Sequence, residues 1–153
     1  MPTDKKNTPR ISVIIPALNE AATIGDTIRA IPAYVDTLLV VDDGSTDATA
    51  AIAAEHGALV RRHARNRGVG SAFNTGIHAA RELDPDIVVN MDADGQFNPV
   101  DMAALIDPIV EGRADFVTAS RFKDPALAPR MPLAKRWGNW GMARIVSAIV
   151  GLR

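Results

Sequence analysis

Short apolar runs alternate with amphipathic segments along this chain, and this alternation is the feature that most limits its fold. The runs are rich in β-branched residues and nearly continuous, which is typical of parallel strands that are covered on both faces. They are "ISVII" (11–15), "TLLVV" (37–41), "ALV" (58–60), "DIVVN" (86–90) and "DFVTA" (115–119). Between them, residues 20–31, 46–56 and 69–83 have helical patterns, and Asn98-Pro99 is suited to start another helix. The pattern predicts an α/β sandwich around a mainly parallel sheet.

Composition indicates one globular core in a reducing compartment. The chain has 153 residues, of which 47% are apolar, and no cysteine. A net charge of −1 gives no reason to expect a nucleic-acid partner. The first ten residues are polar and no apolar run reaches the roughly 18 residues of a membrane span, so we expect a cytoplasmic protein, soluble or peripheral at the inner face of the membrane.

Charge is unevenly distributed along the sequence. Residues 1–112 have nine Lys/Arg and sixteen Asp/Glu, whereas residues 113–153 have eight and two. The basic end includes Lys135, Arg136 and Arg144 near Trp137 and Trp140. This segment has two interpretations: an interfacial helix on anionic lipid, or an ordinary helix that covers the sheet or mediates a dimer.

Polar residues follow four of the predicted strands, where an open parallel sheet binds its ligands. The runs lead into "PALNE", "DDGSTD", "MDADGQ" and "SR". In an extended chain Asp92, Asp94 and Gln96 would present oxygen atoms to one side, and Mg²⁺ or Mn²⁺ prefers such ligands. A polar turn before a capped helix is the alternative. An EF-hand is excluded because its sixth and twelfth positions would be Phe97 and Ala103.

The other strand-end motifs each have a structural alternative. Asn19 is either a ligand-binding residue or the cap of the following helix, and Asp43-Gly44 and Ser45 suit a turn and a cap. Asp42 directly follows a core strand, where a carboxylate needs donors such as those of a nucleotide. In "RRHARNRGVG", Arg67 is the best phosphate candidate because a glycine-bearing turn leads into a helix. The three histidines have no metal-like spacing and are expected at the surface or at helix ends.

Five motifs in order resemble the inverting GT-A glycosyltransferases of family two. They are "SVIIPALNEAATIGDTI", "VVDDGSTDAT", "RNRGVGSAFNTGI", "NMDADGQFNP" and "ADFVTASRF". Within the family the chain is most similar to the dolichol- or polyprenyl-phosphate mannosyl and glucosyl transferases. The resemblance implies a Rossmann-like three-layer α/β sandwich, a nucleotide-sugar donor such as GDP-mannose or UDP-glucose, a divalent cation, and a polyprenyl phosphate acceptor.

The resemblance also implies roles for individual residues. Asp92 and Asp94 would hold the metal and the diphosphate with Gln96 as a further ligand, and Arg121 would meet a phosphate of acceptor or donor. Arg130 and Arg136 are weaker candidates for that phosphate. The donor-binding residues would be Pro16, Ala17, Asn19, Glu20, Asp42, Asp43, Arg67 and Gly68.

The resemblance further implies a division of the chain and leaves several functions open. We expect a tail (1–9), a GT-A core (10–122), and an acceptor loop with an amphipathic helix (123–153), without the C-terminal part that family members normally have. A nucleotide-sugar-binding protein without turnover and a transferase with a hydroxyl acceptor remain alternatives. An oxidoreductase is disfavoured because "IIPALNE" stands where a glycine-rich turn should follow the first strand.

Overall fold

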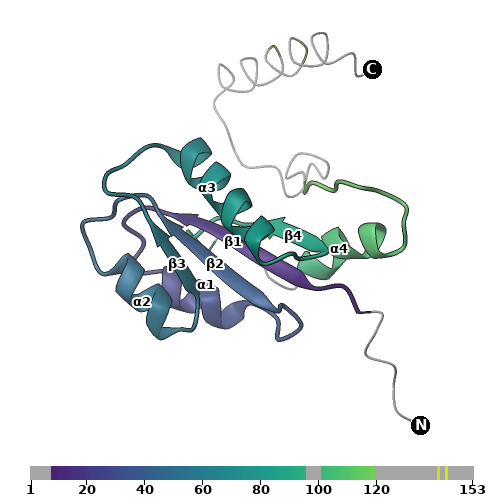
Figure 1. The fold of residues 1–153 in the computed structure, drawn as a ribbon, viewed down its shortest axis with the longest axis horizontal. Helices are drawn as coiled ribbons and strands as arrows, with labels where there is room; N and C mark the ends of the chain where they lie inside the picture. The colour runs from purple at the N-terminus through teal and green to yellow at the C-terminus, as the bar shows by residue number, and fades with distance from the viewer. Residues whose placement is uncertain (1–7, 96–100, 120–140, 142–143, 145–153) are drawn as a thin grey trace. The chain divides into compact units, whose positions relative to one another are not determined.

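The computed structural model describes residues 8–95, 101–119, 141 and 144 (Figure 1). The chain divides into two compact units, Met1–Val117 and Thr118–Arg153. Almost all of the described residues belong to the first unit, which contains the sheet and its helices. In the described part of the chain, no helix is long and apolar enough to span a bilayer.

A four-stranded parallel sheet forms the centre of the first unit. Its strands are β1 (Ile11–Ala17), β2 (Thr37–Asp42), β3 (Leu59–Arg62) and β4 (Ile87–Asn90), in the spatial order β3-β2-β1-β4. The strand order reverses beside β1, since the chain adds β2 and β3 on one side and β4 on the other. In open α/β sheets, such a switch point is where ligands bind.

Helices cover both faces of this sheet. α1 (Ile24–Ala30), α2 (Thr49–Glu55) and α4 (Met102–Val110) contribute to a core that includes Val13 and Ile15. α3 (Val69–Glu82) packs on the opposite face, where its alanines meet Ile14, Leu39 and Val41. Figure 1 shows α3 on one side of the sheet and α1 and α2 on the other. The predicted three-layer α/β sandwich is confirmed.

Four of the five predicted strands form, and the fifth prediction is wrong. Residues 115–119 have no strand structure, and Phe116 is 82% exposed. A strand needs backbone partners as well as apolar side chains, and an apolar run alone does not reveal whether such partners are available. The expected start of a helix at Asn98-Pro99 lies outside the described residues.

The outer strands also differ from the expectation that each strand is covered on both faces. β1 is buried along nearly its whole length, whereas β4 alternates between buried and exposed residues and β3 is mostly exposed. Only the two central strands of the described sheet, β1 and β2, are thus largely enclosed. The ends of β1 and β2, where two of the predicted site motifs begin, therefore follow well-buried strands.

Candidate functional site

The register of the sheet aligns the strand ends from which the site is built. Ala17 of β1 pairs with Asp42 of β2, and Asp42 pairs with Arg62 of β3. Because the strands are parallel, the loops that follow all three leave the same edge of the sheet. The segments "LNE", "DGSTD" and "HARNRG" are thereby brought together, as the sequence predicted for its strand-end motifs.

Side chains tie the loop after β1 to the loop after β2. The Ser45 hydroxyl accepts a hydrogen bond from the backbone N–H of Asn19 at 2.9 Å, and the Asn19 amide oxygen accepts one from the N–H of Thr46 at 2.9 Å. Asn19 adopts a left-handed conformation with φ of 56°. The alternative that Asn19 and Ser45 are helix caps is wrong, because their bonds cross between loops and α1 and α2 begin later, at Ile24 and Thr49.

Asp42 is a fully buried carboxylate at the end of β2. Its Oδ1 accepts a hydrogen bond from the backbone N–H of Ser45 at 2.9 Å. Its Oδ2 lies 2.9 Å from Nε of Arg62, yet no donor in the described structure meets it with hydrogen-bonding geometry. The ion pair with Arg62 therefore offsets part of the cost of burying this carboxylate.

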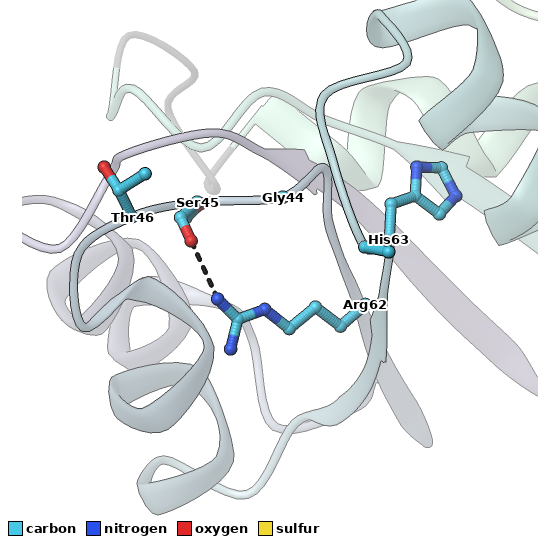
Figure 2. Close-up of a pocket in the computed structure, with 6 residues that line it drawn as sticks. Gly44, Ser45, Thr46, Arg62 and His63 are labelled. Carbon is cyan, nitrogen blue, oxygen red and sulfur yellow. Dashed lines mark hydrogen bonds between the residues drawn. The ribbon is translucent and has the colours of Figure 1, made fainter.

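A hollow of about 450 Å³ lies beside this ion pair. It is lined by Gly44, Ser45, Thr46, Arg62, His63 and Ala64. Figure 2 shows Arg62 reaching from β3 to the loop after β2, where it donates to the Ser45 carbonyl oxygen at 2.7 Å. The hollow is thus bordered by a guanidinium, a hydroxyl and backbone groups, which are suited to a polar ligand.

The Asp43 carboxylate is also buried, and its described partners are groups of the protein. Its Oδ1 lies 2.6 Å from Nδ1 of His63, and its carboxylate accepts from the backbone N–H groups of Arg67 at 3.0 Å and Gly68 at 2.8 Å. Burial alone would raise the pKa of Asp43, but the hydrogen bonds from His63, Arg67 and Gly68 together hold that pKa below its ordinary value. Asp43 is therefore ionised near neutral pH, and its carboxylate oxygens accept hydrogen bonds from groups of the protein.

Asp92 and Asp94 lie in the segment that follows β4. Both are exposed, and they alternate with Met91 and Ala93, which are buried at 3% and 4% exposure. The sequence predicted an extended segment beyond Asn90, but the backbone bends at residues 93–95, and only the alternation of exposure agrees with that expectation. Two exposed carboxylates two residues apart are chemically suited to a hard divalent cation, whose preferred ligands are oxygen atoms. The predicted third ligand, Gln96, lies outside the described residues.

Two acidic residues alone do not make a complete metal site. Among the residues that the structure describes, no group of three or more His, Cys, Asp and Glu side chains could hold a metal ion. A cation at Asp92 and Asp94 would need further oxygen ligands, and a diphosphate is chemically suited to supply them. The donor set thus fits a metal that is bound together with a phosphate ligand.

The remaining predicted site residues differ in how accessible they are. Pro16 and Glu20 are half-buried, whereas the side chain of Ala17 belongs to the apolar core. Arg67 is exposed and Gly68 adopts φ of 89° directly before α3. The N–H of Gly68 already donates to Asp43 and Asn66. The candidates Arg121, Arg130 and Arg136 lie outside the described residues.

Sequence analysis missed two residues of the site, Arg62, which pairs with Asp42, and His63. His63 was expected at the surface, but it is only 8% exposed and bonded on both ring nitrogens, to Asp43 and Thr75. The signal available in the sequence was weak: His63 follows a strand directly, at the same edge as the acidic motifs. The expectation is correct for His78, which is exposed, and for His56, which ends α2.

Comparison with known proteins identifies the family. Residues 12–148 match the family described as glycosyl transferase family 2. The chain belongs to this family. The match includes every strand of the sheet, the loops that carry Asn19 and Asp42, and the Asp92 and Asp94 pair.

Relatives in the family include two transferases whose names specify a lipid phosphate. The UDP-N-acetylglucosamine–dolichyl-phosphate N-acetylglucosaminyltransferase of Methanococcus voltae is 36% identical over 92% of this chain and 63% of its own length. The polyprenol monophosphomannose synthase of Mycolicibacterium smegmatis is 36% identical over 79% of this chain and 48% of its own length. The chain thus spans between about half and two thirds of the length of these relatives.

Solved structures of GT-A glycosyltransferases share the fold. Glucosyl-3-phosphoglycerate synthase from Mycobacterium tuberculosis, in complex with Mn²⁺, UDP and glucosyl-3-phosphoglycerate, matches 67% of this chain and 40% of its own, with a TM-score of 0.57 and 34% identity. Mannosyl-3-phosphoglycerate synthase from Rubrobacter xylanophilus matches with a TM-score of 0.59 and 32% identity. The fold predicted from the sequence is therefore the GT-A fold.

Proposed function

We propose that this protein transfers mannose or glucose, with inversion, from GDP-mannose or UDP-glucose to a polyprenyl phosphate, and that it depends on Mg²⁺ or Mn²⁺. The observation that carries the proposal is the pair of exposed carboxylates, Asp92 and Asp94, at the edge of the sheet where the Asn19 and Asp42 loops also lie. A related structure with Mn²⁺ and UDP supports a donor and a cation of this kind.

Asp92 and Asp94 would hold the cation, and Gln96 would be a third ligand. When bound, a divalent cation supplies positive charge that stabilises a leaving nucleoside diphosphate. Arg67 would add a second positive charge from the turn before α3, and Arg121 would meet a phosphate of donor or acceptor. The protein would hold these charges in place before the reaction begins. Charges that are already oriented lower the activation barrier most effectively.

Asp42 would lie beside the nucleobase. Because its carboxylate is buried, it would act through Arg62, whose exposed guanidinium it orients at the border of the hollow. The adjacent hollow offers the Arg62 guanidinium as a donor to a base carbonyl. Both uracil and guanine have a ring carbonyl that could accept this hydrogen bond from Arg62.

A phosphate acceptor would need no general base at this site. A lipid phosphate is already an anion near neutral pH and attacks without losing a proton, whereas a sugar hydroxyl needs a base. The names of two relatives, which specify dolichyl phosphate and polyprenol monophosphomannose, support the same acceptor class.

The first test is calorimetric titration of GDP-mannose and UDP-glucose into the chain, with Mn²⁺ and with chelator. We expect one donor to bind only with Mn²⁺. Asp94→Ala should weaken that binding at least tenfold while the unfolding temperature stays unchanged, because Asp94 is exposed. Glu55→Ala, which removes an exposed acid from α2, is the control and should bind as the wild type does.

The outcomes separate the competing functions. Failure of the folded wild-type chain to bind either donor would overturn the proposal. Donor binding without sugar transfer to polyprenyl phosphate or to phosphoglyceric acid would favour a binding-only protein. Transfer to phosphoglyceric acid but not to the lipid would favour the alternative that the phosphoglycerate synthases represent.

A further inference from the structure

We infer that His63 is a positioning residue for the donor site, which acts through Asp43 to fix the Arg67–Gly68 turn. The inference rests on the proposed function only for the role of that turn in donor binding. The contacts that define it lie within the described first unit and join three segments: the end of β2, the residue after β3, and the turn before α3.

His63 is held at both ring nitrogens. Nδ1 lies 2.6 Å from Oδ1 of Asp43, and Nε2 lies 2.9 Å from the Thr75 hydroxyl on α3. The side chains of His63 and Asp43 are 7% and 5% exposed. An ionised carboxylate only accepts hydrogen bonds, so Nδ1 has the proton and donates it to Asp43. The ring is therefore oriented from both sides and in turn orients the carboxylate.

Asp43 uses the rest of its carboxylate to hold the turn. Oδ2 accepts from the backbone N–H of Gly68 at 2.8 Å, and both oxygens lie within 3.2 Å of the N–H of Arg67. These bonds require one carboxylate orientation, since both oxygens face backbone donors while Oδ1 also faces His63. A change at His63 would thus be transmitted to the backbone of Arg67 and Gly68.

Gly44 provides a second, independent indication that this turn is built on the loop after β2. A Cβ at Gly44 would lie 2.5 Å from the carbonyl carbon of Arg65 and 2.7 Å from the N atom of Asn66. The two backbones therefore approach more closely than any side chain would permit. The segment before Arg67 packs directly on the Asp43-Gly44 turn and is not an independent surface loop.

The functional consequence concerns Arg67. Its side chain is exposed, but its backbone N–H is bonded to a buried carboxylate. A guanidinium on a fixed backbone loses less conformational freedom when it binds a phosphate than one on a mobile loop. His63 would therefore strengthen donor binding without touching the donor.

Amide hydrogen exchange of Arg67 and Gly68, measured by NMR, tests the inference without any ligand. His63→Gln moves the amide toward the Nε2 position and away from Asp43, and we expect at least tenfold faster exchange at both amides. His63→Asn places an NH₂ group near the Nδ1 position and should restore most of the protection. His78→Asn, at an exposed position of α3, is the control. Amides of β1 should keep their protection in all variants.

Equal exchange in wild type and His63→Gln would overturn the inference, as would equal loss of protection in His63→Gln and His63→Asn. If His63→Gln does not fold, Thr75→Val removes only the second partner of the ring. It should then increase exchange at Arg67 and Gly68 by a smaller factor, and unchanged exchange would again contradict the inference.

Donor binding gives the functional measurement. We expect His63→Gln to weaken binding of the donor with Mn²⁺ about tenfold, and the double variant with Arg67→Ala to bind no more weakly than Arg67→Ala alone. Additive losses would show that His63 does not act through Arg67. If the wild-type chain binds no donor, the proposed function fails, while the exchange measurement still decides whether His63 fixes the turn.

Discussion

Asp43 joins three segments of the chain through one carboxylate, and this makes it a sensitive residue. Replacing it by Asn removes the charge and turns an NH₂ group toward backbone donors. We expect Asp43→Asn to lower the free energy of unfolding by about 1–3 kcal/mol at pH 7, because buried donors lose their acceptor. Urea unfolding of both proteins measures the difference.

The same difference should depend on pH in a defined direction. The pKa of Asp43 is lowered in the folded state, so the unfolded chain, with a pKa of about 3.9, binds the proton first as the pH falls. The stabilisation is therefore complete above about pH 5 and is lost as the pH falls through the folded value. The difference in the free energy of unfolding between wild type and Asp43→Asn should become smaller below about pH 4. A difference in the free energy of unfolding that stays constant down to pH 3 would show that the negative charge of Asp43 does not cause the stabilisation.

At the scale of residues, the sequence predicted the exposed carboxylates but not the contacts that organise the site. The exposure of Asp92 and Asp94 could be predicted because both acids follow a buried strand at a spacing of two, although the backbone bends at 93–95 instead of staying extended. The hydrogen-bond partners of Asp43 could not be predicted, because His63 and Gly68 are 20 and 25 residues away along the chain. Only the pairing of β2 with β3 brings them together.

At the scale of elements, the packing of α3 on the sheet depends on a glycine. A Cβ at Gly76 would lie 2.4 Å from Cγ2 of Ile14 on β1. Gly76→Ala should therefore force α3 away from the sheet and lower the free energy of unfolding by about 1–3 kcal/mol. Chemical denaturation of the variant measures this cost.

Gly70 offers a matched control in the same helix. Nothing lies within 4 Å of a Cβ at Gly70, so Gly70→Ala should stabilise the protein by up to about 1 kcal/mol through helix propensity. The cost of Gly76→Ala should also shrink in an Ile14→Ala background, because the clashing methyl group is then absent. Equal effects of the two glycine substitutions would contradict the close approach of α3 to β1.

The elements themselves were predictable where burial and periodicity agree. α3 ends within one residue of its predicted limit, and β1 and β2 contain the predicted apolar runs. Prediction failed at 115–119, where an apolar run has no strand structure, and at the caps, where Asn19 and Ser45 bond between loops. Whether an apolar run becomes a strand, and whether a polar residue caps a helix, depends on tertiary contacts that a local sequence pattern does not contain.

At the scale of the whole molecule, the sequence has an acidic body and a basic end. Residues 113–153 have eight Lys/Arg and two Asp/Glu, and Trp137 and Trp140 lie among Lys135, Arg136 and Arg144. Each basic residue near an anionic membrane surface contributes about 1 kcal/mol, so three such residues would increase binding roughly a hundredfold. We propose that this segment attaches the protein to anionic lipid, where a polyprenyl phosphate would be presented.

Co-sedimentation with vesicles tests this attachment. The chain should bind phosphatidylcholine vesicles that contain phosphatidylglycerol, and binding should weaken steeply as salt rises to about 0.5 M. Lys135→Glu with Arg136→Glu should weaken binding by more than tenfold. Lys5→Glu with Lys6→Glu makes the same charge change near the N-terminus and should leave binding unchanged if the basic end acts locally. No binding at low salt, or equal loss in both variants, would show that this segment does not recognise the membrane.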